Sequence, residues 1–418
     1  MSAVVRRGTC GALFIVTAAA GCCLSGAPSG GTVLPPPLVL APAPIAVPEE
    51  LPMVGLEGTD ARGEPLRSAE MLGFQALLRA RRFDDLCTYV TTLEDDFESD
   101  VTHESWPIQA LEAFDAPYAD AAALHDAWVA ATPECWAAYA ARGHYLSAMG
   151  FAERGDAWAA DTAPEALDAM AEYFVRAADD FDRSLAMRPR QVAAPIALLD
   201  IASALGDRAS VRAIYAEAIG SCPDCMELRF AYLRNVRPRW GGEPVEIEAT
   251  LAAVDARRRR GLEVFRAYAD YDRCYELRSA RLYDEALAAC DSALAAEPYW
   301  RYFVERGSVR RARSELIEAL ADLDRALEVR PRASGAMIER VAVLADLERN
   351  AEAAEQLQLV VHIAPEEVRL MRRGSALASW IIAERESARA SGRTAGAEHF
   401  DAILYDVLLP EDPRRPVR

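Results

Sequence analysis

The chain has 418 residues, a hydrophobic content of 52% and a formal charge of −19. This length and composition provide enough apolar material for a large folded core. The acidic balance argues against a nucleic-acid partner, because such binding depends on neutralising phosphates with basic side chains. All 46 basic residues are arginine. The lack of lysine excludes P-loop proteins, Schiff-base enzymes, the usual kinases and serine-lysine hydrolases.

The N-terminal segment, residues 1–21, has the features of a bacterial export signal. Arg6 and Arg7 provide a positive start, and the apolar run over residues 11–20 is too short to span a membrane stably. The small residues before Cys22 resemble a lipobox, which predicts that Cys22 is acylated. We therefore expect an exported lipoprotein of the outer membrane or periplasm, held on the membrane only by its lipid. Cleavage after Ala27 is the alternative and would release a soluble secreted protein.

Residues 22–66 are expected to form a linker. The part over residues 28–52 is rich in Pro, Ala and Gly. Such a composition favours polyproline II, so we expect a semi-rigid tether, with a polyproline ligand as the alternative. Structure should begin near Ser68, where a polar residue precedes an apolar stripe of helical spacing. A helical solenoid domain is then expected over residues 67–262.

One sequence motif with helical periodicity is repeated between residues 282 and 365. Ala286 and Ala319 take the same place in successive copies, and the copies end at Pro298, Pro331 and Pro365. A period of about 34 residues matches two helices of three to four turns with short connections. Alanine permits close helix crossing, and proline ends each second helix. We therefore predict an all-α fold, an α-solenoid of stacked antiparallel helix pairs, with three repeats over residues 263–365, capping helices over 366–408 and a tail over 409–418.

This pattern resembles the tetratricopeptide repeat. The residues that carry the resemblance are Gly307, Ala319, Leu323, Ala326 and Pro331. Cys274 and Val341 depart from it, because they stand where the first helix of a repeat usually has Gly or Ala. Stacked helix pairs of this kind form a concave groove that commonly binds an extended peptide or a partner helix.

The region from about residue 67 to residue 245 resembles a bacterial family known as domain of unknown function 4034. The resemblance rests on Arg82-Phe83-Asp84-Asp85-Leu86, Ala141-Arg142-Gly143, Leu185-Ala186-Met187-Arg188-Pro189 and Pro238-Arg239-Trp240-Gly241-Gly242. The family implies no activity. The paired glycines predict a tight turn, in which Trp240 is either a buried anchor of the fold or, as the alternative, a binding platform.

Nine cysteines are present. Cys222 and Cys225 form a C-x-x-C pair at the expected start of a helix, for which we expect a local disulfide, with free thiols as the alternative. Cys274 and Cys290 sit on the two helices of one repeat, so a disulfide between them depends on geometry. A thiol or metal protein centred on Cys222 and Cys225 is an alternative function. No further ligands are clustered near that pair in the sequence, and we expect no metal and no cofactor.

Other candidate chemistry is sparse. The D-x-D triplets at residues 180–182, 270–272 and 322–324 could in principle hold a divalent cation, but they are expected to be solvated helix faces, because residues two apart diverge on a helix. An unrecognised hydrolase built from scattered Asp, Glu and His, with His144 among them, is a further alternative for which the sequence offers no catalytic constellation.

The predicted binding residues come from the repeat register. Aromatic and basic side chains take inward positions on the first helices, namely Tyr268, Tyr271, Tyr275, Arg278, Arg301 and Arg311. Tyrosine offers contact area with little rotamer entropy, and arginine can bind carboxylates bidentately. We predict that these residues bind an unidentified protein or peptide in a non-enzymatic scaffold at the cell envelope. The alternative is that the tyrosines pack against the segment that precedes them.

Overall fold

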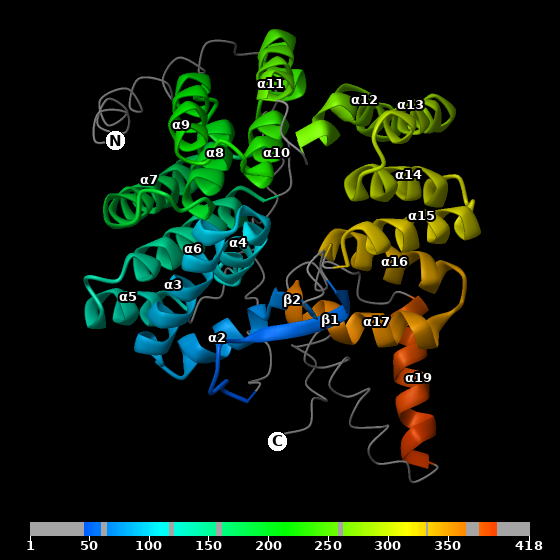
Figure 1. The fold of residues 1–418 in the computed structure, drawn as a ribbon. Helices are drawn as coiled ribbons and strands as arrows, with labels where there is room; N and C mark the ends of the chain where they lie inside the picture. Colours follow the sequence, from blue (N-terminus) through cyan, green and yellow to red (C-terminus); the bar gives the residue numbers. More distant parts are fainter. Residues whose placement is uncertain are drawn as a thin grey trace, which may run out of the picture. The chain divides into compact units, whose positions relative to one another are not determined.

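The computed structural model describes residues 46–59, 65–116, 121–155, 161–257, 262–331, 333–364 and 376–390. Within these ranges the secondary structure is helical except for one two-stranded hairpin, which confirms the predicted all-α solenoid (Figure 1). The described residues divide into two compact units. Unit 1 is Leu78–Pro244, and unit 2 consists of residues 46–77 and 245–390. None of the described helices combines the length and apolarity that a membrane crossing requires.

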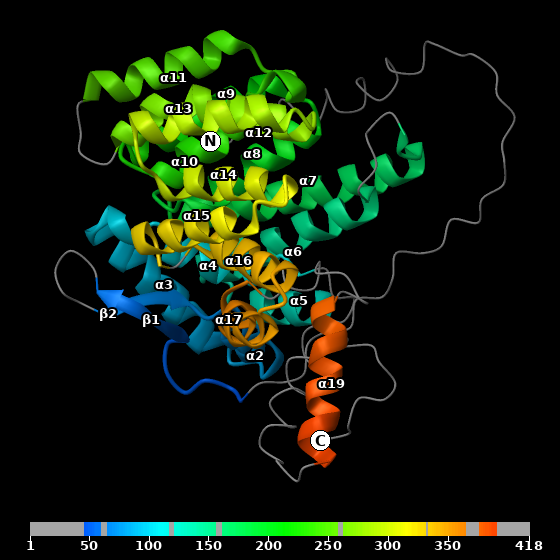
Figure 2. The ribbon, with the colours of Figure 1, turned by 90° about the vertical axis from the view of Figure 1, so that its right-hand side faces the viewer.

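Unit 2 is built on three antiparallel helix pairs that stack in chain order (Figure 2). The pairs are α12 (Tyr268–Ser279) with α13 (Tyr283–Ala296), α14 (Trp300–Ala312) with α15 (Leu316–Val329), and α16 (Ser334–Asp346) with α17 (Asn350–Ile363). Each second helix ends just before one of the prolines that set the sequence phase. The turn between the helices of each pair uses a left-handed residue, at Arg281, Ser314 and Glu348.

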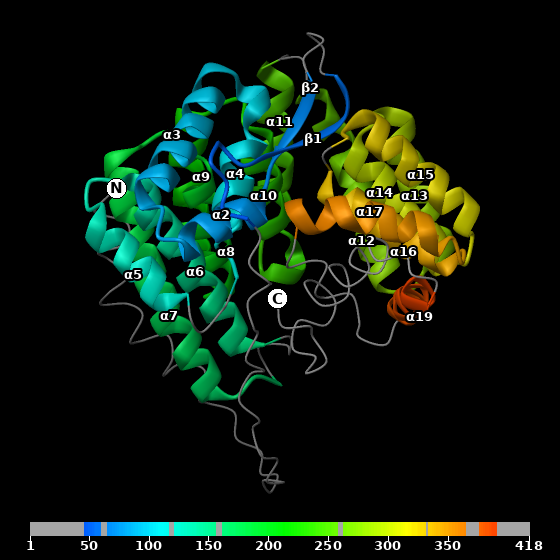
Figure 3. The same cartoon turned by 90° about the horizontal axis from the view of Figure 1, so that it is seen from below.

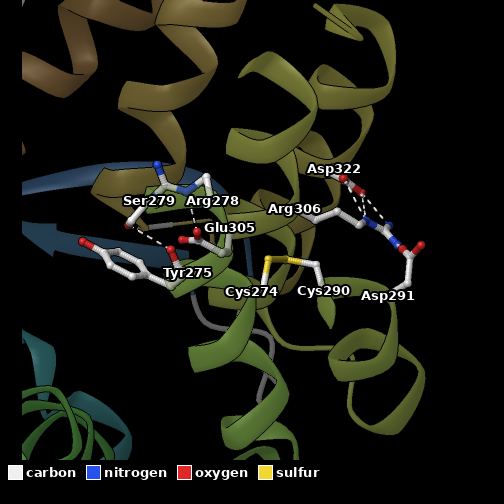
Figure 4. Close-up of a disulfide and its surroundings, with 9 residues drawn as sticks. All are labelled: Cys274, Tyr275, Arg278, Ser279, Cys290, Asp291, Glu305, Arg306 and Asp322. Atoms are coloured by element: carbon white, nitrogen blue, oxygen red, sulfur yellow. Dashed lines mark hydrogen bonds and ion pairs between the residues drawn. A yellow bond between two sulfur atoms is a disulfide. The ribbon is translucent and has the colours of Figure 1, made fainter. Parts of the chain in front are cut away.

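The two helices of a pair cross most closely at one repeated position. In the middle pair, a Cβ atom added to Gly307 would lie 3.3 Å from Cγ of Leu323. A larger residue would push the helix axes apart, which explains the glycine. The equivalent positions hold Cys274 with Cys290 in the first pair and Val341 with Leu357 in the last pair. In the first pair the contact is a disulfide, with Cα atoms 5.3 Å apart (Figure 4).

An N-terminal arm over residues 46–77 belongs to unit 2. Its strands β1 (Met53–Thr59) and β2 (Pro65–Ala69) pair antiparallel and lead into α2 (Met71–Arg79). Val54 and Leu56, which alternate with Gly55 and so lie on one face of the strand, pack against the core of the last repeats. Oε1 of Glu70 lies 2.6 Å from Nδ1 of His362 on α17. The arm therefore covers the end of the solenoid.

The arm corrects two of our expectations about the domains. The linker predicted over residues 22–66 ends earlier, because a two-stranded hairpin that would be marginal alone gains a hydrophobic surface to pack on. The predicted boundary at residue 262 also moves, since unit 2 already includes α11 (Pro244–Arg257) from Val245 onward. The predicted capping region over 366–408 contains one described helix, α19 (Ala376–Ala390), which packs on α17.

Unit 1 contains a longer helix pair, α6 (Trp136–Arg154) and α7 (Pro164–Met187), which run side by side (Figure 3). A Cβ atom on Gly143 would lie 2.7 Å from Cε1 of Phe181, so the glycine makes room for the ring. The other elements are α3 (Phe83–Ser99), η1 (Val101–His103), α4 (Ser105–Glu112), α5 (Ala122–Ala131), α8 (Ala193–Ala204), α9 (Arg208–Ser221), α10 (Met226–Asn235) and η3 (Pro238–Trp240).

One polar contact recurs in both units. In unit 1, Arg142 binds Asp180 on the facing helix through two nitrogens, at 2.7 and 2.8 Å, and Asp126 on the preceding helix at 3.0 Å.

In unit 2, Arg306 makes the same two contacts, with Asp322 and with Asp291 at 2.7 Å. Asp180 and Asp322 are both buried, so in two of the three D-x-D triplets the first residue is a paired core residue rather than part of a solvated face, whereas Asp270 is half-buried. Each arginine precedes the glycine at the helix crossing, so the two units share a local packing motif.

Candidate functional site

The tyrosines of α12 differ in burial. Tyr268 is only 1% exposed, so a partner cannot reach it without unfolding the helix. Its ring centroid lies 5.7 Å from that of Tyr271, which in turn lies 5.0 Å from the buried ring of Tyr302. The Tyr302 hydroxyl donates a hydrogen bond to the carbonyl of Val264 in η4 (Leu262–Ala267), just before α12. Tyr268 is therefore a core residue that packs beside the preceding segment, and its ring is not accessible to a partner.

Tyr271 and Tyr275 are half-buried on the same helix. The Tyr271 ring is fixed by the aromatic cluster beneath it. The Arg278 guanidinium lies over the Tyr275 ring, with Cζ 5.1 Å from the centroid. Nε of Arg278 lies 2.5 Å from Oε1 of Glu305 on α14 (Figure 4). Both tyrosines are thus held in place before any partner binds, which lowers the entropy cost of using them in an interface.

Two arginines of the predicted set, Arg278 and Arg311, already have acidic partners in the chain. Arg311 repeats the contact of Arg278 one pair later, because it lies 3.5 Å from Glu339 on α16 and also 2.6 Å from Asp346. Burial alone would lower the pKa of Arg278, but the attraction of Glu305 outweighs it and raises that pKa. A partner's carboxylate would therefore have to compete with Glu305 and Glu339 for these arginines. The sequence did not show the pairing, because each partner belongs to the next repeat along the chain.

Arg301 has a different environment. Its guanidinium Cζ lies 4.4 Å from the ring centroid of Trp300, and the Arg330 guanidinium lies 5.0 Å from the same ring. Trp300 is buried. The Arg301 guanidinium is thus stacked on a buried tryptophan and lies apart from the Arg278 and Arg311 ion pairs.

A row of apolar side chains crosses the three first helices, which pack side by side in the order α12, α14, α16. Tyr271, Val304 and Ile338 take equivalent places in successive repeats, and all three are half-buried. The next row is formed by the half-buried Tyr275, Ser308 and Ala342. We call these six residues the apolar stripe. Sequence reasoning missed the four on α14 and α16, because Val, Ile, Ser and Ala carry no signal until the repeat register aligns them.

The C-x-x-C pair is joined as a disulfide at the start of α10, with Cα atoms 5.5 Å apart. The buried carboxylate of Glu104 accepts hydrogen bonds from the backbone N–H groups of Met226 and Glu227, at 2.8 and 3.0 Å. Burial and then the nearby Glu227 raise the pKa of Glu104 to about 7, although the backbone hydrogen bonds act in the opposite direction. This carboxylate uses the amide groups that would otherwise stabilise a thiolate at the helix N-terminus. The surroundings thus favour a structural disulfide over a reactive thiol.

A third disulfide was not predicted. Cys87 on α3 is bonded to Cys135, the residue before α6, with Cα atoms 6.1 Å apart. The two lie on separate elements outside the repeat phase, so the sequence offered no geometric reason to pair them. Among the described residues, no group of three or more His, Cys, Asp and Glu is arranged to hold a metal ion. Cys22 lies outside the described residues.

His144 is a core residue of the α6 and α7 pair. Its Nδ1 lies 2.8 Å from Oδ1 of Asp115, and its ring meets the Phe181 ring edge-on at 5.3 Å. The side chain is 6% exposed. This burial leaves no access for a substrate at His144, so the hydrolase alternative gains no support from it.

The turn at residues 238–242 has the shape that its glycines predict. Gly241 has a φ of +80°, and a Cβ atom on Gly242 would lie 2.0 Å from the carbonyl oxygen of Val236. Trp240 is 41% exposed, and the Arg239 guanidinium Cζ lies 5.7 Å from its ring centroid. The expectation of a buried anchor is therefore wrong, because this tight turn holds the tryptophan at the surface.

A search of solved structures found weak similarities to two proteins. Yeast Tom70 is 14% identical, with a TM-score of 0.39, 78% of this chain covered and 63% of that chain covered. The TPR domain of P58(IPK) is 12% identical, with a TM-score of 0.25 and coverage of 77% of this chain and 97% of that chain. The chain thus spans less than two thirds of the Tom70 chain. No family model and no curated protein matches, so the resemblance to domain of unknown function 4034 stays a prediction.

Proposed function

We propose that this protein is a non-enzymatic scaffold that binds a partner protein or peptide along the apolar stripe of unit 2. The observation that carries the proposal is the stripe itself, in which preorganised tyrosines and aliphatic side chains lie at matching positions of three adjacent helices. The flanking arginines are compensated by Glu305 and Glu339. A partner rich in apolar side chains fits such a surface better than an acidic one, which would have to displace carboxylates already bound.

The same proposal places the protein outside the cytoplasm. What supports this is the use of six cysteines in three disulfides, which persist mainly in oxidising compartments. Acylation at Cys22 would tether the scaffold to a membrane of the cell envelope, and release as a secreted protein is the alternative. Mass spectrometry of the mature N-terminus distinguishes the two. An acylated Cys22 supports the tether, whereas an unmodified N-terminus after Ala27 overturns it.

The binding face is tested by crosslinking and co-purification of the mature protein from its native envelope fraction. A Tyr275→Ala variant should lose a protein that the wild type retains, because the substitution removes one of the two aromatic rings of the stripe. Tyr173→Ala is the matched control, since Tyr173 on α7 is also half-buried and has an arginine, Arg176, on the next turn with Cζ 5.7 Å from its ring. Equal retention by both variants would exclude the stripe as the binding face.

A further inference from the structure

The segment before the arm has an unusual composition for a linker. Residues 33–48 contain no polar or charged side chain, and seven of these sixteen residues are Val, Leu or Ile. Flexible linkers are ordinarily polar, since exposed contiguous apolar surface is costly and uncommon in soluble proteins. The prolines exclude both a helix and a central strand. This composition therefore calls for an apolar surface that an extended chain can cover.

The C-terminal end of this segment is fixed on unit 2. A Cβ atom on Gly73 of α2 would lie 2.5 Å from Cβ of Pro52 and 3.2 Å from Cγ of Pro48. Pro52 is buried, and its carbonyl accepts a hydrogen bond from the N–H of Glu70 at 2.9 Å. The chain therefore leaves the described fold from the unit that also carries the apolar stripe.

The length of the segment is sufficient to cover the stripe. Packed helices lie about 8–10 Å apart, so α12, α14 and α16 together span about 20 Å between their outer axes. Thirteen residues, the length of the segment 33–45, would extend over about 40 Å in a polyproline II conformation, at about 3.1 Å per residue. The segment is therefore about twice as long as the width of the three first helices.

The chemistry of the two surfaces also matches. Proline-rich segments bind to aromatic-lined grooves, because the polyproline II conformation is already extended and loses little entropy on binding. The stripe offers the rings of Tyr271 and Tyr275 and the aliphatic Val304 and Ile338, with its neighbouring arginines already compensated. An uncharged ligand suits this face.

We propose that residues 33–45 bind along the apolar stripe of their own chain and occupy it until a partner displaces them. This inference rests on the proposed function, because it assumes the same binding face and assigns to it a ligand from the same chain. A tethered segment has an effective concentration in the millimolar range, so it competes with any partner in solution. Binding of a partner would then release the segment and lengthen the tether between Cys22 and the arm.

The test uses the full mature chain with a photoreactive residue in the segment. Leu38→p-benzoylphenylalanine is irradiated, and the crosslinked peptides are identified by mass spectrometry. We expect links to peptides of α12, α14 or α16 within a monomer. The same residue at Ser29, outside the apolar run, is the matched control and should give none of these links. Links only to unit 1, only between two chains, or to no site would overturn the inference.

A second measurement follows the competition directly. A synthetic peptide of residues 32–48 should bind the variant with Leu34→Ser, Leu38→Ser and Leu40→Ser at least about tenfold more tightly than the wild type, because the wild-type face is occupied. Adding Tyr275→Ala to the variant should weaken the binding, whereas adding Tyr173→Ala should not. Equal affinity for the wild type and the triple variant would contradict the inference.

The two proposals can fail separately. If Tyr275→Ala loses an external partner but position 38 does not link to unit 2, the self-ligand is wrong and the binding face stands. If the links form but no envelope protein depends on Tyr275, the segment is a permanent covering and the scaffold function is wrong.

Discussion

The first and last helix pairs of unit 2 have the same geometry but are held together by different residues. The α12 and α13 pair packs in a small cluster of mostly small buried side chains, namely Cys274, Ala286, Ala289 and Cys290, together with Val309 of α14. The α16 and α17 pair shares a larger cluster, whose members include Met337, Val341, Leu344, Leu357, Val360 and Ile363. At the crossing position, the first pair has a disulfide and the last pair has a valine beside a leucine.

This difference indicates that a disulfide can take the place of apolar packing between two helices. Each buried methylene contributes about 0.8 kcal/mol to the free energy of folding, so a cluster of alanines stabilises a helix pair much less than one of leucine, valine and methionine. A disulfide that closes a loop of this size contributes about 3 kcal/mol. The Cys274–Cys290 bond therefore provides in the first pair what apolar packing provides in the last.

Removing the large side chain at the crossing of the last pair should have the largest effect. Leu357→Ala is expected to lower the free energy of unfolding by about 4 kcal/mol, because the core around Leu357 is closely packed and a cavity remains. Urea unfolding followed by circular dichroism measures the loss. Leu282→Ala is the control, since Leu282 is 47% exposed and its truncation should change the stability by less than about 0.5 kcal/mol. Similar losses in the two variants would contradict the comparison.

Removing the disulfide should have a slightly smaller effect. The double substitution Cys274→Ala and Cys290→Ala should cost about 3 kcal/mol of unfolding free energy, measured under oxidising conditions. Exchanging the pair for that of the middle repeat, with Cys274→Gly and Cys290→Leu, should recover part of this loss through packing. It should also make the stability of the pair independent of added reductant. If the exchanged pair is no more stable than the double alanine variant, packing does not replace the covalent bond at this crossing.

The buried ion pair of the middle repeat gives a third test. Asp322 lies 2.8 Å from Arg310 and also binds Arg306, whereas the first pair has the buried Ala289 at the equivalent position. Asp322→Ala should cost about 2 kcal/mol, because two partly buried arginines lose a buried partner. Asp291→Ala removes the exposed partner of Arg306 and should cost less than about 1 kcal/mol. Equal costs, measured by chemical unfolding, would mean that burial does not distinguish the two carboxylates.

Unit 1 contains a buried carboxylate without such compensation, and this should produce a pH dependence. Among the described residues neither oxygen of Glu94 has a hydrogen-bond partner. Burial, opposed by Arg188 and reinforced by Glu98 and Asp95, raises the pKa of Glu94 to about 8. Because this folded-state pKa lies above the usual 4.5, the protonated form is favoured in the fold. The stability is therefore full below pH 4.5 and is lost as the pH rises toward 8.

The measurement is the free energy of unfolding between pH 5 and pH 8 for the wild type and for Glu94→Gln. The wild type should lose up to about 1.4 kcal/mol per pH unit relative to the variant, which cannot ionise. Glu98→Gln serves as a comparison, because it removes one of the charges that raise the pKa of Glu94 and should narrow the pH range of the loss without abolishing it. Parallel profiles for the wild type and Glu94→Gln would show that Glu94 does not titrate inside the fold.

The sequence predicted the repeat pairs well, because their signals are local. The prolines that follow α13, α15 and α17 and the alanines at positions 286, 319 and 353 of the second helices recur once in every repeat. The Cys274–Cys290 spacing suggested a bond for the same reason, since both residues belong to one pair. The stripe on α14 and α16 was missed because Val304 and Ile338 are ordinary residues whose importance lies only in their alignment with Tyr271.

Contacts between distant parts of the sequence could not be predicted in this way. The Cys87–Cys135 bond joins segments that share no repeat phase. The linker prediction over residues 22–66 rested on a Pro-, Ala- and Gly-rich stretch without a repeating apolar face. Val54 and Leu56 acquire a buried face only from helices near the other end of the chain. The ion pairs of Glu305 with Arg278 and of Glu339 with Arg311 could not be predicted, because they form only where the first helices of successive repeats pack side by side.

The position of the arm also sets an order of events during synthesis. Residues 46–77 leave the ribosome before unit 1, yet the surface that they cover is completed only when α17 and α19 have been made. The hairpin therefore lacks the surface on which it packs until all of unit 1 and the helix pairs of unit 2 have been synthesised. The folding of unit 2 is therefore completed last, although its arm is synthesised before unit 1. A chain truncated before α17 should still contain a folded unit 1, but its arm would lack the surface on which it packs.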